Sequence, residues 1–166
     1  MDAAGLQTLF RFNTFANEGV RQALLASDEE LLRKPLDGYW FDSVFTLLTH
    51  AANAERLWLA RISDEEVAAG QLKPDELTTQ TLVDAWRGND EEWERWAATA
   101  TPEALDRIGT WRRSDGKLYE IRHWQVAAHV ATHSTNHRGH ATVAMTALGI
   151  KHGPQEFLDQ LSALPS

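Results

Sequence analysis

The sequence contains no cysteine among its 166 residues. Disulfide bonds and thiolate metal sites are therefore excluded, because both need a cysteine sulfur. Basic residues are also scarce, since 16 Lys and Arg face 24 Asp and Glu, which gives a formal net charge of −8. Because nucleic acids are bound through clustered positive charge, we expect no nucleic-acid partner.

Long apolar segments are also missing. No run approaches the roughly 20 apolar residues that a membrane-spanning helix needs. Asp2 stands where a secretory signal would carry basic residues, and no apolar segment follows it. We therefore expect a cytoplasmic protein without a membrane partner. A chain of this length is expected to form one domain over residues 1–166, which can bury about two-thirds of its unfolded surface.

Apolar spacing and helix-capping residues predict four long helices. Their expected bounds are residues 3–25, a second helix from a Ser43 cap to about 62, a third from Thr78 or Thr79 to about 98, and a fourth from about 119 to 148, ended by Gly149. A short helix capped by Ser27 is expected before Pro35. This set predicts an all-α four-helix bundle. The long connection between the third and fourth helices allows a crossover.

Residues 107–119 depart from the helical pattern. Ser114, Asp115 and Gly116 form a turn signal between two short segments, 108–111 and 117–119. The arrangement predicts a small β-hairpin or an irregular loop. Glu120 would then lie in the first turn of the last helix, where an acidic residue is favourable.

Histidine is the residue that the chain has in excess. Of 7 histidines, four fall between residues 129 and 140 and share one face of the last helix, at about 100° per residue: His129, His133, His137 and His140. The four-residue spacing recurs twice, so helical geometry alone does not select the pair that could bind one ion. The alternative is a set of hydrogen-bonded histidines without a metal.

His50 is the candidate third ligand. It lies at helical spacing with Leu47, Ala54 and Leu57, so we expect its side chain to point inward from the second long helix. A buried histidine facing inward histidines on another helix makes a site with three nitrogen ligands reasonable.

Other site chemistries have weaker support. The zincin motif His-Glu-x-x-His is absent, and the chain lacks the glycine-rich loops that hold nucleotides. Glu120 and His123 form one Glu-x-x-His motif, whereas a di-iron bundle needs two. Ser134 is adjacent to His133, but neighbouring residues of a helix do not face each other, so a Ser–His nucleophile pair is not expected.

The segment His133-Ser-Thr-Asn-His137-Arg138-Gly139-His140, preceded by Leu47-Leu48-Thr49-His50, resembles the DinB-like (YfiT-like) family of metal-binding four-helix bundles. The resemblance covers most of the chain, from about Leu6 to Gly149. It implies that His50, His133 and His137 bind the metal. His129 and His140 match no ligand position of the family. At the position of His140 the family more usually has Gln. They are expected behind the ligands or beside the substrate, and a different ligand set stays open.

The resemblance also implies function. Members of this family bind a divalent metal, often zinc or nickel, and frequently form homodimers. Several relatives are thiol-dependent S-transferases that use mycothiol, bacillithiol or glutathione, and others are maleylpyruvate isomerases or metal-dependent hydrolases. The resemblance therefore implies a metalloenzyme with a small-molecule substrate.

Three imidazole ligands leave a divalent ion with an open position, which is typical of catalytic sites. Such a site can activate water or hold a thiol as thiolate. Because the chain has no cysteine, the thiol would come from a low-molecular-weight cosubstrate. Our leading hypothesis is thiol transfer to an electrophile. A metal-dependent hydrolase, a non-catalytic metal-stabilised stress-response bundle and a metal-free interaction protein stay open.

Several flanking residues have two interpretations each. Arg138 could anchor an anionic group of the substrate, but an ion pair with an acidic residue of the chain is preferred. Trp58 and Trp124 could line the mouth of the site, although tryptophan at helical spacing more often lies in a core. Gly139 suggests the close approach of a neighbouring helix. The remaining helical tryptophans are assigned to packing or a dimer face: Trp86, Trp93 and Trp96.

Overall fold

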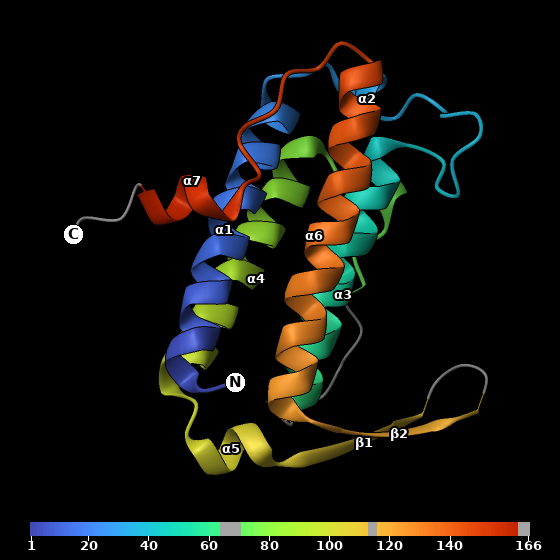
Figure 1. The fold of residues 1–166 in the computed structure, drawn as a ribbon. Helices are drawn as coiled ribbons and strands as arrows, with labels where there is room; N and C mark the ends of the chain where they lie inside the picture. Colours follow the sequence, from blue (N-terminus) through green and yellow to red (C-terminus); the bar gives the residue numbers. More distant parts are fainter. Residues whose placement is uncertain (64–70, 113–115, 163–166) are drawn as a thin grey trace.

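The computed structural model describes residues 1–63, 71–112 and 116–162. Four long helices pack together, and a two-stranded hairpin lies at one end of them (Figure 1). The long helices are α1 (Ala3–Leu25), α3 (Val44–Ile62), α4 (Thr79–Thr99) and α6 (His123–Ala147). The short elements are α2 (Glu29–Leu32), η1 (Pro74–Glu76), α5 (Pro102–Asp106), β1 (Ile108–Arg112), β2 (Leu118–Arg122) and α7 (Phe157–Ser162). The predicted all-α four-helix bundle with a small hairpin is confirmed.

Side-chain caps explain where three of the long helices begin. The Asp2 carboxylate accepts a hydrogen bond from the Gly5 amide at 2.9 Å. Ser43 Oγ accepts from the Thr46 amide at 3.1 Å, and Thr78 Oγ1 accepts from an amide in the first turn of α4. Each cap satisfies an N–H group that has no partner inside its helix. The predicted caps at Ser43 and Thr78 are therefore confirmed.

The predicted cap of the short helix was wrong by one residue. Asp28, not Ser27, caps α2, since its carboxylate accepts from the Glu30 amide at 3.0 Å. The Ser27 hydroxyl instead donates to the Ala23 carbonyl at 2.7 Å. The Ser27 hydroxyl therefore bonds to the last turn of α1, although the sequence pattern predicted that it would cap α2.

The predicted start of the last helix was also wrong. Residues from Leu118 onward, including Glu120, continue as β2 and pair antiparallel with β1, from Ile108 opposite Arg122 to Arg112 opposite Leu118. Cross-strand pairing delays the helix until His123. Glu120 therefore lies in a strand and not in a first helical turn. The predicted turn residues Ser114 and Asp115 lie outside the described residues.

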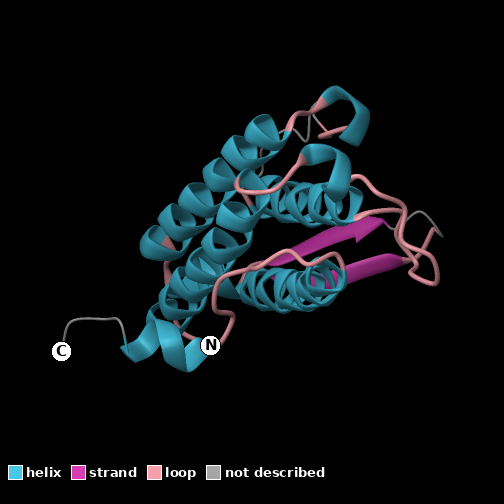
Figure 2. Cartoon of the chain, turned by 90° about the horizontal axis from the view of Figure 1, so that it is seen from above, coloured by secondary structure: helices cyan, strands magenta, loops and turns pink. Residues whose placement is uncertain are grey.

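The long helices do not follow a simple up-down order. Arg33, just after α2, donates to the carbonyls of Pro74 and Leu77, just before α4. The starts of α3 and α4 therefore lie at the same end of the bundle, and these two helices run in parallel (Figure 1). The crossover connection therefore joins the second and third long helices, α3 and α4. The sequence pattern had allowed one between the third and fourth, α4 and α6. Seen from above, both strands extend to the side opposite the chain termini (Figure 2).

Tryptophan and phenylalanine side chains fill the core. Trp86 and Trp93 are fully buried. Trp86 lies in the upper core cluster, with Phe45 and Leu48, and Trp93 lies in the lower core cluster, with Phe10 and Leu59. Phe10 stacks on Trp93 with ring centroids 4.6 Å apart, and Trp96 contacts Trp93 edge-on. The assignment of these tryptophans to packing is confirmed.

An ion-pair group that reaches from the buried Arg21 to the partly exposed Glu18 and Arg87 joins α1 to α4. Glu18 accepts from Arg87 at 2.8 Å and from Arg21 at 2.9 Å. The hydrogen bond from Arg87 is the main cause that lowers the pKa of Glu18 to about 2, against the opposing effect of burial.

We expect Glu18→Gln to lower the free energy of unfolding at neutral pH by about 1 kcal/mol or less, since the group is partly exposed. The pKa of Glu18 is lower in the folded than in the unfolded chain. Its stabilisation is therefore present above pH 4.5 and is lost as the pH falls towards 2. Urea unfolding of both proteins across this range measures the difference. A difference that stays constant with pH would contradict the assignment.

Candidate metal centre

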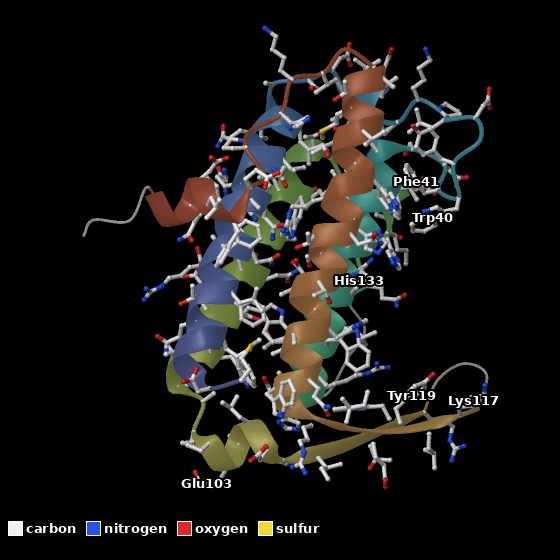
Figure 3. The ribbon with its side chains drawn as sticks, in the orientation of Figure 1. Trp40, Phe41, Glu103, Lys117, Tyr119 and His133 are labelled. Carbon is white, nitrogen blue, oxygen red and sulfur yellow. The ribbon has the colours of Figure 1, made fainter. Side chains whose placement is uncertain are left out.

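Three histidines from two helices converge on one side of the bundle. His50 projects from α3, and its ring centroid lies 5.6 Å from that of His133 and 5.0 Å from that of His137. The two histidines of α6 are one helical turn apart, with Nε2 atoms at 2.9 Å. Each residue offers one ring nitrogen, and these nitrogens lie within 4.8 Å of one another. Figure 3 places His133 on the same side as Trp40 and Phe41.

The donor set fits a divalent cation. Imidazole nitrogens bind zinc at about 2.0–2.1 Å, so two ligands of a tetrahedral ion stand roughly 3.3 Å apart. The His133–His137 separation of 2.9 Å is close to that value. Nδ1 of His137 is buried and has no hydrogen-bond partner among the described residues. His50, His133 and His137 could therefore hold a divalent metal ion.

The electrostatics of the cluster favour neutral rings. Burial, followed by repulsion from the neighbouring imidazoles, lowers the pKa of His133 to about 4. Burial, followed by repulsion from His50 and His140, lowers the pKa of His137 to about 4. At neutral pH both rings are therefore unprotonated and keep a lone pair for a metal ion.

His50 departs from the expected burial. The sequence predicts an inward side chain, but the structure leaves this residue exposed. It lies at the border between the buried face of α3 and solvent, since Leu47 is buried and Ala54 is half-buried. The cluster is therefore open to solvent on the side of His50.

The other two histidines of the predicted face flank the cluster. The ring centroid of His129 lies 5.7 Å from that of His133, and that of His140 lies 6.4 Å from that of His137. The shared face of these four histidines on α6 is thus observed. Neither flanking residue belongs to the group of nitrogens within 4.8 Å in the described part of the chain.

Trp40 is a site residue that the sequence reasoning missed. Its side chain is 63 % exposed, although its ring lies 5.5 Å from His137 and 6.3 Å from His50 between centroids. It lies between the predicted short helix and the predicted helix that starts at Ser43, in a segment to which the sequence reasoning assigned no site residue. The available signal is the run of three aromatic residues, Tyr39, Trp40 and Phe41, in an otherwise polar loop.

The two tryptophans predicted at the mouth of the site have different positions. Trp58 contacts His129 edge-on at 5.6 Å, and the guanidinium of Arg61 lies 4.6 Å from a Trp58 ring centroid. Trp111 of the hairpin also packs edge-on against Trp58. Trp58 and Trp124 both pack against the lower core cluster. Trp58 in addition borders the histidine face through its contact with His129.

Arg138 is only 2 % exposed and lies inside the bundle. It donates to the amide oxygens of Asn13, Asn17 and Gln155 and to the hydroxyl of Thr135. The preferred interpretation as an ion pair was therefore wrong, because the hydrogen-bond acceptors around the guanidinium are neutral groups. Burial lowers its pKa to about 10, although the more distant Glu55 and Asp90 raise it.

The expected close approach at Gly139 was also wrong. A Cβ atom built there meets nothing within 4 Å in the described part of the chain. Of the two histidines without a predicted role, His123 is buried at the start of α6. His152 is exposed, and its Nδ1 lies 3.0 Å from the Gly153 carbonyl oxygen.

Glu55 is the second residue that the sequence reasoning missed. It is fully buried and accepts hydrogen bonds from Trp86 Nε1 at 2.9 Å, from Ser134 Oγ at 2.6 Å and from Asn13 and Asn17. The available signal is an acidic residue within the apolar face of a helix. A carboxylate at such a position needs donors from neighbouring elements.

A cluster of three histidines on two helices of a four-helix bundle is compatible with a metal-binding helical protein. The family model described as the DinB family matches residues 1–163, and the chain belongs to this family. Metal binding is a general property of the family, and the resemblance stated from the sequence is confirmed. No curated protein matches the chain. Among the described residues, no helix has the length and apolar character needed to cross a membrane.

We expect His133→Ala to abolish stoichiometric metal binding, because it removes a nitrogen from the central pair. His129→Ala is the matched control, since it removes an imidazole one turn earlier on the same face and should keep the metal. Elemental analysis of protein purified without a histidine tag measures both. Full metal content in His50→Ala, together with loss in His129→Ala, would show that the ligand set is different.

Proposed function

We propose that this protein is a metal-dependent thiol S-transferase, which uses a low-molecular-weight thiol to attack an electrophile. The observation that carries the proposal is a cluster of three histidines, open to solvent on the side of His50, in a chain without cysteine. His50, His133 and His137 are the proposed ligands. A bound divalent cation would supply positive charge that stabilises a thiol in its thiolate form at neutral pH.

The exposure of His50 supports catalysis over a purely structural metal. A structural site is closed by protein ligands, whereas a catalytic site keeps a position for water or substrate. Here α3 and α6 supply three nitrogen donors, and the side of His50 faces solvent. A cosubstrate can therefore approach without rearrangement of the helices.

Aromatic side chains support a small organic substrate. Trp40 stands over one end of the cluster, and Trp58 borders the other end beside His129. Their ring faces offer apolar surface to an electrophile. The Arg61 guanidinium on Trp58 supplies a positive charge at the same edge. We infer that the substrate is a small molecule and that no nucleic acid is bound.

The remaining parts of the proposal rest on the family. Imidazole ligands suit both zinc and nickel, so we propose one of these metals. By resemblance we also propose a homodimer in the cytoplasm, with residues 1–166 as one domain. His129 and His140 are proposed to lie beside the substrate rather than on the metal.

The proposed activity is tested with protein freed of metal by chelation and then reloaded with zinc or nickel. Glutathione, bacillithiol and mycothiol are each offered with monochlorobimane. In the expected reaction the sulfur forms a bond to carbon as chloride leaves, and fluorescence reports the product. We expect turnover with one of these thiols for metal-loaded protein, and none for metal-free protein or His133→Ala. His152→Ala is the control for loss of a histidine outside the cluster.

Three outcomes would replace the proposal. If no thiol supports turnover but metal-loaded protein cleaves para-nitrophenyl acetate, the protein is a metal-dependent hydrolase. If neither substrate reacts and the metal only raises the unfolding temperature, the metal ties α3 to α6 in a non-catalytic bundle. Substoichiometric metal that does not change in His133→Ala would favour a metal-free interaction protein.

A further inference from the structure

The proposed ligands come from two separate helices. His50 belongs to α3, whereas His133 and His137 belong to α6. The distance between the ligand nitrogens therefore depends on the spacing of these helices and on the rotation of each about its axis. A shift of about 1 Å in such a constellation is enough to impair a site, so something must hold the two helices in register.

The residue after each α6 ligand is anchored inside the bundle. Ser134 follows His133 and is fully buried, and Arg138 follows His137 and is 2 % exposed. Successive helical residues differ by about 100°, so the two anchors lie one above the other beside the ligand face. Ser134 Oγ donates to Glu55 of α3 at 2.6 Å.

The Glu55 carboxylate, which accepts this bond, also accepts hydrogen bonds from other helices. Glu55 follows His50 by five residues on α3, which turns it about 140° away from the ligand and into the bundle. Its carboxylate also accepts from Trp86 of α4 and from Asn13 and Asn17 of α1. Donors from three other long helices thus fix its position.

We propose that Ser134 and Glu55 are positioning residues of the metal centre. Their hydrogen bond sets the spacing of α3 and α6 and the rotation of α6 at which His50 meets His133 and His137. Arg138 supports the same rotation, because its guanidinium donates to Asn13 and Asn17 of α1. The proposal rests on the ligand assignment made above, but it concerns residues that do not touch the metal.

Ser134→Ala tests this role. The substitution removes one hydroxyl and leaves the Glu55 carboxylate with its donors on α1 and α4. Thr49→Val is the matched control. Thr49 directly precedes His50, is 1 % exposed, and donates its hydroxyl to the Phe45 carbonyl of its own helix at 2.8 Å. Thr49→Val therefore removes a buried hydroxyl next to a proposed ligand, and it leaves every hydrogen bond between α3 and α6 in place.

The dissociation constants for zinc and cobalt are measured by competition with a chromophoric chelator. We expect Ser134→Ala to raise both dissociation constants roughly tenfold. It should also change the visible spectrum of the cobalt-loaded protein. Thr49→Val should keep both constants and the spectrum. Thermal unfolding of the metal-free forms measures how much stability each variant loses.

Three outcomes would overturn the proposal. Unchanged affinity and spectrum in Ser134→Ala would mean that the hydrogen bond has no part in positioning. An equal loss of affinity in Thr49→Val would mean that general loosening of the bundle is responsible. If the wild-type protein binds no metal, the ligand assignment fails, and this inference fails with it; the wild-type titration distinguishes that case from the other two.

Discussion

The buried carboxylate of Glu55 is the interaction on which the arrangement of the helices depends. An ionised carboxylate inside a protein is costly unless donors surround it. Here the donors come from α1, α4 and α6, so the hydrogen bonds of one side chain of α3 specify how the other three long helices meet. Asp90, Arg21 and Arg138 extend this polar interior, since Arg21 pairs with Asp90, and Asn17 donates to Asp90 and accepts from Arg138.

The histidine cluster occupies the outer side of the same pair of helices. On α6 the ligand face lies next to the anchored face, because His133 and His137 each precede a buried polar residue. On α3 the exposed His50 and the buried Glu55 lie on different sides of the helix. A buried polar interior can thus support a histidine cluster that is open to solvent, as the proposed cosubstrate would require.

Local sequence signals predicted much of this structure. Caps at Ser43 and Thr78 and apolar spacing located the long helices, because both depend on residues within a few positions of each other. They failed where two local patterns competed. Ser27 could cap a helix or end one, and residues around Glu120 could begin a helix or pair as a strand. In both cases a contact outside the pattern decided the outcome.

The sequence by itself determined that the chain forms a helical bundle and that four histidines share one face of its last helix, since helical periodicity is a local property. Only the tertiary structure decided the surroundings of that face. Ser134 meets Glu55 across 79 residues, and Arg138 meets Asn13 across 125 residues. Trp40 likewise reaches the cluster from a loop with no periodicity to analyse. Such contacts depend on how whole helices pack, and no spacing within one segment encodes them.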